Sequence, residues 1–133
     1  MMKVLLVEDD QILQELYRDE FLKQGFEVVM AGTGRAGVIE AAKGVDFILL
    51  DIMMPDIDGV TAFKHLKELP ETKHIPVGFL TVVPQGVPQA LNKDQEIFKE
   101  AVAYWSKDKY TPIEIVQMVK TYLTKPIAKV PVD

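Results

Sequence analysis

Residues 47–50 read Phe47-Ile48-Leu49-Leu50, a wholly apolar run that ends directly at the carboxylate of Asp51. Because the run shows no alternation of apolar and polar residues, it indicates a strand buried on both faces of a parallel sheet. Three similar runs lie around it in the chain, Val4–Val7, Val28–Met30 and Val77–Leu80, and a weaker fifth lies at Val102–Trp105. These runs predict the strands of one sheet, although Gly78 would interrupt the fourth of them.

The segments between the runs carry the signals of helices. Two of them place apolar residues at helical spacing, Leu13, Leu16, Tyr17 and Phe21 in the first and Ala62, Leu66 and Leu69 in the second. The last helix should begin at Thr111, with Pro112 in its first turn and Glu114 completing a capping box. Gly25 and Gly44 follow the first two helices, where a residue in the left-handed conformation commonly ends a helix.

Strand and helix therefore alternate about five times, which predicts an α/β fold: a three-layer (βα)5 sandwich with a parallel five-stranded sheet. The segment 82–93 does not fit this pattern, since Pro84, Gly86 and Pro88 would each disturb a helix. We expect residues 1–124 to form one domain. Residues 125–133 carry two prolines and little periodicity, and they are expected to form a tail or the start of a linker.

Composition narrows the class of protein. The chain has 133 residues, 48% of them apolar, which is enough for a single core, and its net charge is −5. Basic residues are scattered, which argues against direct binding of nucleic acid. Cysteine is absent, so a thiolate metal site is excluded. The apolar run Val4–Val7 is too short for a signal peptide or a membrane span, so we expect a cytoplasmic protein without a membrane partner.

Carboxylates follow two of the predicted strands at the point where each strand ends. Glu8, Asp9 and Asp10 come after the first strand, and Asp51 ends the third. In an open parallel sheet, ligands bind at the carboxyl ends of the strands, so these groups should meet in one crevice. Clustered carboxylates repel one another unless a cation neutralises them, and hard oxygen ligands suit Mg²⁺ or Mn²⁺.

The segment Asp51-Ile52-Met53-Met54-Pro55-Asp56-Ile57-Asp58-Gly59 resembles the phosphoacceptor segment of the response-regulator receiver domains of two-component systems. The resemblance spans residues 2–124 and includes Thr81 after the fourth strand and Lys107 after the fifth. It implies a flavodoxin-like strand order 2-1-3-4-5. It also implies that Asp51 receives a phosphoryl group in a magnesium-dependent reaction, so that the chain catalyses its own phosphorylation and dephosphorylation and is not otherwise an enzyme.

The resemblance further assigns roles to individual residues. Asp51 is the nucleophile and a metal ligand, Asp9 binds the metal directly, and Glu8 helps through water. The carbonyl of Met53 is the third protein ligand, and Asp10 is expected to cap a helix.

Three residues complete the implied site. Thr81 and Lys107 donate to the phosphoryl oxygens, which spreads the transferred charge over fixed donors. Thr81 and Tyr104 form the switch that responds to phosphorylation. The implied partners are a histidine kinase or histidine phosphotransfer protein, and a downstream protein or fused output domain, with a possible phosphorylation-linked dimer. Asp108 stands where the family usually has proline.

Three rival functions remain open. A metal-dependent aspartyl-phosphate hydrolase would usually need a second acid two residues after the nucleophile, where this chain has Met53. A flavin-binding electron carrier would need a phosphate loop after the first strand, where Glu8, Asp9 and Asp10 would repel a phosphate. A receiver-like interaction module that is never phosphorylated would not require the complete set of acids, threonine and lysine.

Overall fold

The computed structural model describes residues 1–54, 59–81 and 99–124. The strands are β1 (Lys3–Val7), β2 (Glu27–Ala31), β3 (Phe47–Asp51), β4 (Val77–Thr81) and β5 (Ala103–Ser106). The helices are α1 (Gln11–Lys23), α2 (Gly34–Ala42), α3 (Gly59–Glu68) and α6 (Pro112–Thr124). Each predicted apolar run overlaps one strand. The segment 82–93, the tail 125–133 and residues 55–58 of the phosphoacceptor segment lie outside the described residues.

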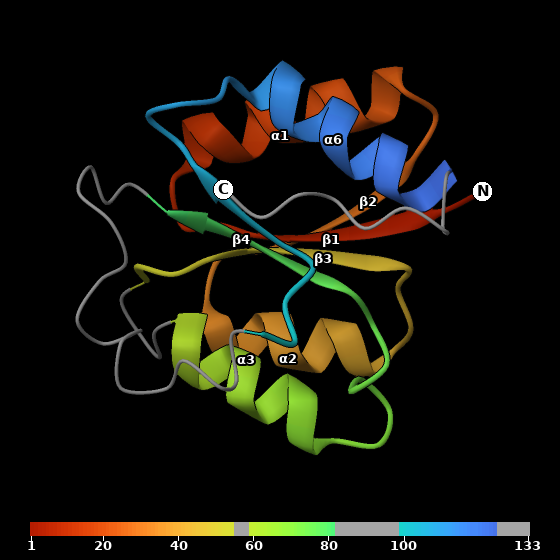
Figure 1. Cartoon of the computed structure of the whole chain (residues 1–133), viewed down its shortest axis with the longest axis vertical. Helices are drawn as coiled ribbons and strands as arrows, with labels where there is room; N and C mark the ends of the chain where they lie inside the picture. Colours follow the sequence, from red (N-terminus) through yellow and green to blue (C-terminus); the bar gives the residue numbers. More distant parts are fainter. Residues whose placement is uncertain (55–58, 82–98, 125–133) are drawn as a thin grey trace.

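The five strands form one parallel sheet in the order β2-β1-β3-β4-β5. Helices α1 and α6 cover one face of this sheet, and α2 and α3 cover the other, as the edge-on view in Figure 1 shows. The predicted three-layer fold and the predicted strand order are therefore confirmed. The chain runs from β1 outward to β2 and then crosses back over β1 to β3 on its other side, and such a reversal opens a crevice at the carboxyl edge of the sheet.

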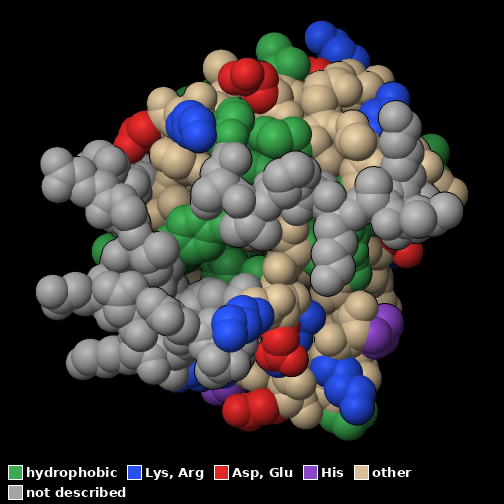
Figure 2. All heavy atoms as spheres, viewed as in Figure 1, with side chains coloured by type: hydrophobic (Ala, Val, Ile, Leu, Met, Phe, Trp, Pro, Cys, Tyr) green, Lys and Arg blue, Asp and Glu red, His purple; other side chains and the backbone are tan. Residues whose placement is uncertain are grey.

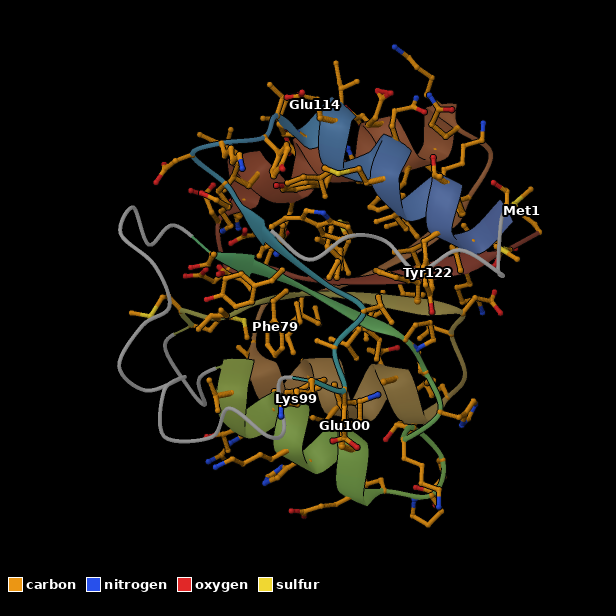
Figure 3. The ribbon with its side chains drawn as sticks, in the orientation of Figure 1. Met1, Phe79, Lys99, Glu100, Glu114 and Tyr122 are labelled. Carbon is orange, nitrogen blue, oxygen red and sulfur yellow. The ribbon has the colours of Figure 1, made fainter. Side chains whose placement is uncertain are left out.

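The predicted ends of the helices are also confirmed. The carboxylate of Asp10 accepts the backbone N–H groups of Ile12 and Leu13 at 2.9 and 3.1 Å, which caps α1. At the start of α6, the Thr111 hydroxyl accepts from Glu114 N, and the Glu114 carboxylate accepts from Thr111 N. Figure 3 labels Glu114, which lies in the first turn of α6. Gly25 and Gly44 have φ angles of +93° and +104°, in the left-handed region.

The core has two halves, one on each face of the sheet. On the side of α1 and α6 it includes Tyr17, Phe21, Phe47, Trp105 and Ile115, and on the side of α2 and α3 it includes Phe63, Leu66 and Phe79. The expectation that all four runs are buried on both faces is wrong for β2, where Met30 is 39% exposed. The reason is that β2 forms an edge of the sheet and pairs only with β1 among the described strands.

Strand β4 passes through Gly78 without a break, so the expected interruption is also wrong. Gly78 lies between Leu49 of β3 and Ala103 of β5 in the sheet register. A Cβ atom at this position would lie 2.6 Å from Cζ3 of Trp105 and 3.1 Å from Cζ of Phe47. The indole of Trp105 is 1% exposed and stacks on the ring of Phe47. The glycine therefore provides the space that the buried indole fills.

The surface that faces the viewer in Figure 2 carries acidic and basic side chains side by side. Among the described residues on this face, the lysines and arginines are scattered and do not form one large positive patch. No helix in the described ranges is long and apolar enough to cross a bilayer.

Replacing Gly78 with alanine should destabilise the protein, because the added methyl group collides with the Trp105 ring. Overpacking of this kind costs about 1–3 kcal/mol of unfolding free energy. In a Trp105→Leu background the same change should cost much less, since the smaller side chain leaves room. Urea denaturation followed by circular dichroism, arranged as a double-mutant cycle, measures both costs. Gly32→Ala is the control, because the nearest atom to its new Cβ is 3.7 Å away; equal Gly78→Ala costs in both backgrounds would contradict this packing argument.

Candidate functional site

Three carboxylates meet at the carboxyl edge of the sheet, as the sequence predicted. Glu8 directly follows β1, Asp51 ends β3, and Asp9 is next to Glu8 in the chain. One oxygen of each carboxylate can be chosen so that all three lie within 4.8 Å of one another. Glu8 and Asp51 are 1% and 3% exposed, whereas Asp9 is exposed. The cluster therefore has a buried side formed by two carboxylates and an open side at Asp9.

Lys107 brings a positive charge into this cluster from the loop after β5. Its backbone N–H donates to the carbonyl of Thr81 at 2.6 Å, which ties the loop to the end of β4. Its ammonium donates to Oδ2 of Asp51 at 3.0 Å and also to Oε1 of Glu8. The Lys107 side chain is only 10% exposed. Strands β1, β3, β4 and β5 thus all contribute to one polar site.

Burial and like charge shift the proton equilibria of this site. Burial raises the pKa of the Glu8 carboxyl from 4.5 to about 7, and the charge of Asp51 adds to the rise, while the hydrogen bond from Lys107 opposes it. For Lys107, burial lowers the pKa, but the hydrogen bond with Glu8 and the charges of Asp51 and Glu8 outweigh that effect. The pKa of Lys107 therefore lies above its ordinary value. The site keeps its ammonium charged and weakens the acidity of Glu8.

The backbone around Asp51 is held in place by close packing with the start of α3. The N–H of Met53 donates to Oδ1 of Asp51 at 3.2 Å, and the N–H of Gly59 donates to the carbonyl of Ile52 at 2.7 Å. A Cβ atom on Gly59 would lie 2.3 Å from the carbonyl oxygen of Asp51 and 2.6 Å from Cα of Ile52. Only glycine allows α3 to begin this close to the acidic residue. The Met53 side chain is 59% exposed.

The two residues that the sequence assigns to a switch lie on neighbouring strands. Thr81 ends β4 with 2% of its surface exposed, and Tyr104 lies opposite Phe79 across the β4–β5 pair. The rings of Phe79 and Tyr104 have centroids 6.1 Å apart, and Figure 3 shows Phe79 on the side of the sheet covered by α3. Burial raises the pKa of the Tyr104 hydroxyl, and the nearby Thr81 hydroxyl partly offsets this rise.

The Tyr104 hydroxyl is buried without a hydrogen-bond partner in the part of the chain that the structure describes. Thr81 is nevertheless the polar neighbour that lowers the pKa of this hydroxyl. A buried hydroxyl that lacks a partner costs about 1–3 kcal/mol. The position of this ring is thus less strongly stabilised than that of the fully satisfied groups around it.

The donor set fits a hard divalent cation. Glu8, Asp9 and Asp51 offer only carboxylate oxygens, which Mg²⁺ and Mn²⁺ prefer. Asp9 is exposed, so water can reach the open side of the cluster, and Mg²⁺ usually keeps several of its waters. The three residues could therefore hold such an ion.

Two residues at this site were not predicted from the sequence. The side-chain amide of Gln14 in α1 donates to the carbonyl of Glu8, and the Ser106 hydroxyl accepts from the N–H of Asp108 at 3.2 Å. Ser106 ends β5, so the rule that strand-terminal polar residues matter could have identified it. Nothing in the spacing of Gln14 distinguishes it from other polar helix residues.

The pKa of Glu8 gives a pH-dependent prediction for protein prepared with a chelator. The folded state binds the Glu8 proton more tightly than the unfolded chain, so this proton stabilises the fold fully below pH 4.5, and the stabilisation is lost as the pH rises through about 7. Glu8→Gln cannot lose a proton there. Urea denaturation between pH 4.5 and 8 should show the variant gaining stability relative to wild type as the pH rises. A constant difference over this range would rule out the raised pKa.

Comparisons with known proteins agree with this geometry. Residues 4–120 match the family described as response regulator receiver domain. The polar-differentiation response regulator DivK of Brucella ovis is 31% identical over 123 residues, which cover 90% of this chain and 94% of DivK. The N-terminal domain of a response regulator/sensory box/GGDEF protein from Carboxydothermus hydrogenoformans is 26% identical, with a TM-score of 0.76, covering 94% of this chain and 96% of that domain.

A third relative bears on the fold. The response regulator TrrA from Thermotoga maritima, solved in complex with Mg²⁺-BeF, has a TM-score of 0.74 at 24% identity, and the match covers 91% of this chain and 98% of TrrA. The family match extends over most of the chain, and DivK is matched along nearly its whole length. The chain therefore belongs to the response regulator receiver domain family.

Proposed function

We propose that Asp51 accepts a phosphoryl group from a phosphohistidine on a histidine kinase or a histidine phosphotransfer protein. One observation carries this proposal. The buried Asp51 carboxylate ends β3 with the Lys107 ammonium 3.0 Å away and with the carboxylates of Glu8 and Asp9 beside it. Receiver domains are signalling domains and not classical enzymes, so the product is the phosphorylated chain itself.

In this proposal the divalent ion is held by Asp9, Asp51 and the carbonyl of Met53, with Glu8 contributing through water. The carboxylate cluster and the exposure of Asp9 support this assignment, as does the Mg²⁺-BeF complex of the related TrrA. When bound, Mg²⁺ or Mn²⁺ supplies positive charge that relieves the repulsion between the cluster and an incoming phosphoryl group.

The residues of the chain then carry the transfer. A carboxylate oxygen of Asp51 forms a bond to phosphorus while the phosphorus–nitrogen bond of the donor breaks, and the histidine leaves with its electron pair. Lys107 donates an N–H to one phosphoryl oxygen, and the Thr81 hydroxyl donates to another. Thr81 ends β4, and Lys107 directly follows β5, the strand paired with β4, so both donors come from neighbouring strand ends.

The signal would then pass along the β4–β5 pair. Movement of the Thr81 hydroxyl toward the phosphoryl group changes the surroundings of the Tyr104 hydroxyl, which is already poorly satisfied. A downstream protein or an output domain would recognise that change in the cytoplasm, and the phosphorylated chain would be able to form a dimer. A metal-dependent aspartyl-phosphate hydrolase remains the alternative among enzymes, but Met53 lies where its second acid would be.

The nucleophile can be tested by intact mass. Wild-type protein incubated with Mg²⁺ and acetyl phosphate should gain one phosphoryl group, and Asp51→Asn should gain none, because an amide oxygen is a far weaker nucleophile. Asp19→Asn is the matched control, since Asp19 is exposed on α1 and pairs with Arg18. A phosphoryl adduct on the Asp51 variant at wild-type yield would place the nucleophile elsewhere. An unmodified wild type would favour the interaction module that is never phosphorylated.

The metal site can be tested by comparing two neighbouring acids. Asp9→Asn should weaken Mg²⁺ binding by more than about tenfold. Losing a hydrogen-bond partner of a metal ligand already costs about tenfold, and here the ligand itself is lost. Asp10→Asn should have a much smaller effect, because the Asp10 carboxylate is engaged in capping α1. Trp105 lies two residues before Lys107, so titration of its fluorescence gives the affinities. Equal losses in the two variants would refute the assignment of Asp9 as the direct ligand.

A further inference from the structure

Glu8 is the most firmly held of the three carboxylates. Its backbone N–H donates to the carbonyl of Ala31 at 3.0 Å, and its own carbonyl accepts the amide of Gln14. Oε2 accepts from the N–H of Asp10 at 3.2 Å, and Oε1 accepts from the Lys107 ammonium. Both oxygens are therefore engaged, one by the loop after β1 and the other by the loop after β5. Glu8 joins two loops that are 99 residues apart in the chain.

Lys107 needs such a support, because its charge is carried on a flexible four-carbon stem with many rotamers. The loop fixes the Lys107 backbone through Thr81, and the Ser106 hydroxyl holds Asp108 N. Neither contact reaches the ammonium. Within the described ranges the ammonium donates to Glu8 and Asp51, and the phosphoryl group would form on Asp51. A lysine held by Asp51 alone would lose its anchor during transfer.

We propose that Glu8 is a positioning residue for Lys107, which holds the ammonium beside Asp51 so that it is already in place when the phosphoryl group arrives. This inference rests on the proposed function and adds to it, because there Glu8 acts only through water on the metal ion. Glu8 lies outside the reacting bond throughout, so it can keep its contact while Asp51 changes.

The length of the side chain distinguishes the two roles of Glu8. An aspartate at position 8 keeps a carboxylate near the metal, where a water can bridge the difference. It is shorter by one carbon–carbon bond, roughly 1.5 Å, and so should not contact both Asp10 N and the ammonium. Glu8→Asp therefore keeps the negative charge near the metal but removes the contact with the Lys107 ammonium.

The first experiment measures the order of the Lys107 side chain by NMR, with lysine labelled in ¹³C, in chelator at pH 8. The ε-methylene of Lys107, assigned by its absence in Lys107→Met, should be rigid in wild type and also in Asp51→Ala. In Glu8→Asp with Asp51→Ala, where neither carboxylate can hold the ammonium, it should become as mobile as an exposed lysine, while circular dichroism shows an intact fold. A rigid Lys107 in this double variant, or a mobile one in Asp51→Ala alone, would overturn the proposal.

The second experiment measures Mg²⁺ affinity and the rate of phosphoryl transfer from acetyl phosphate at saturating Mg²⁺. Glu8→Asp should slow the transfer by roughly tenfold to a hundredfold, the cost of misplacing a reacting group by about 1 Å, with a much smaller change in Mg²⁺ affinity. In the Glu8→Asp background, Lys107→Met should add little. If the rate losses of the two single variants multiply in the double variant, the two residues act independently, which contradicts the proposal. If wild type accepts no phosphoryl group, the proposed function fails, and the NMR comparison still decides whether Glu8 holds Lys107.

Discussion

The repulsion between carboxylates buried at one edge of a sheet is the constraint on which this molecule depends. Glu8 and Asp51 are both nearly inaccessible to water, and two buried like charges are unfavourable without a counter-charge. The ammonium of Lys107 provides part of that counter-charge through contacts with both groups. Three carboxylates against one ammonium still leave the cluster negative, and this residual charge makes the site suitable for a divalent cation.

The topology brings these groups together with few local requirements. A parallel sheet with β1 and β3 adjacent and β4 and β5 beyond them places four strand ends along one edge. Glycine is required at Gly59, because a side chain there would press against the backbone of Asp51 and Ile52. Gly78 lies inside β4, away from this edge, and it makes room for the indole of Trp105. Trp105 lies two residues before Lys107 in the chain. The position of the lysine thus depends on packing inside the core as well as on contacts at the edge.

Local sequence signals predicted most of this arrangement. The apolar runs predicted the strands within a residue or two, and Asp10, Thr111, Gly25 and Gly44 marked helix ends, because strand burial and capping depend on neighbouring residues. The meeting of Glu8, Asp9 and Asp51 followed from the rule on strand ends.

Features that depend on distant residues were missed or misjudged. The exposure of Met30 depends on β2 being an edge strand, and the role of Gly78 depends on the Trp105 indole, which approaches from another strand. The bond between Glu8 and Lys107 joins residues far apart in the chain, and local spacing carries no signal for it. The assigned roles of Thr81, Tyr104 and Met53 remain part of the proposed function, because position alone does not show what a hydroxyl or a carbonyl does during transfer.

The described residues include one group that is engaged on every side and another that is not. Glu8 is fixed through its N–H, its carbonyl and both carboxylate oxygens. Tyr104, on the other face of the β4–β5 pair from Trp105, has a buried hydroxyl without a partner. Groups that are fully satisfied resist displacement, whereas an unsatisfied one gains from almost any change that offers a partner. Under the proposed function, a phosphoryl group on Asp51 therefore acts on the β4–β5 pair before it acts on β1.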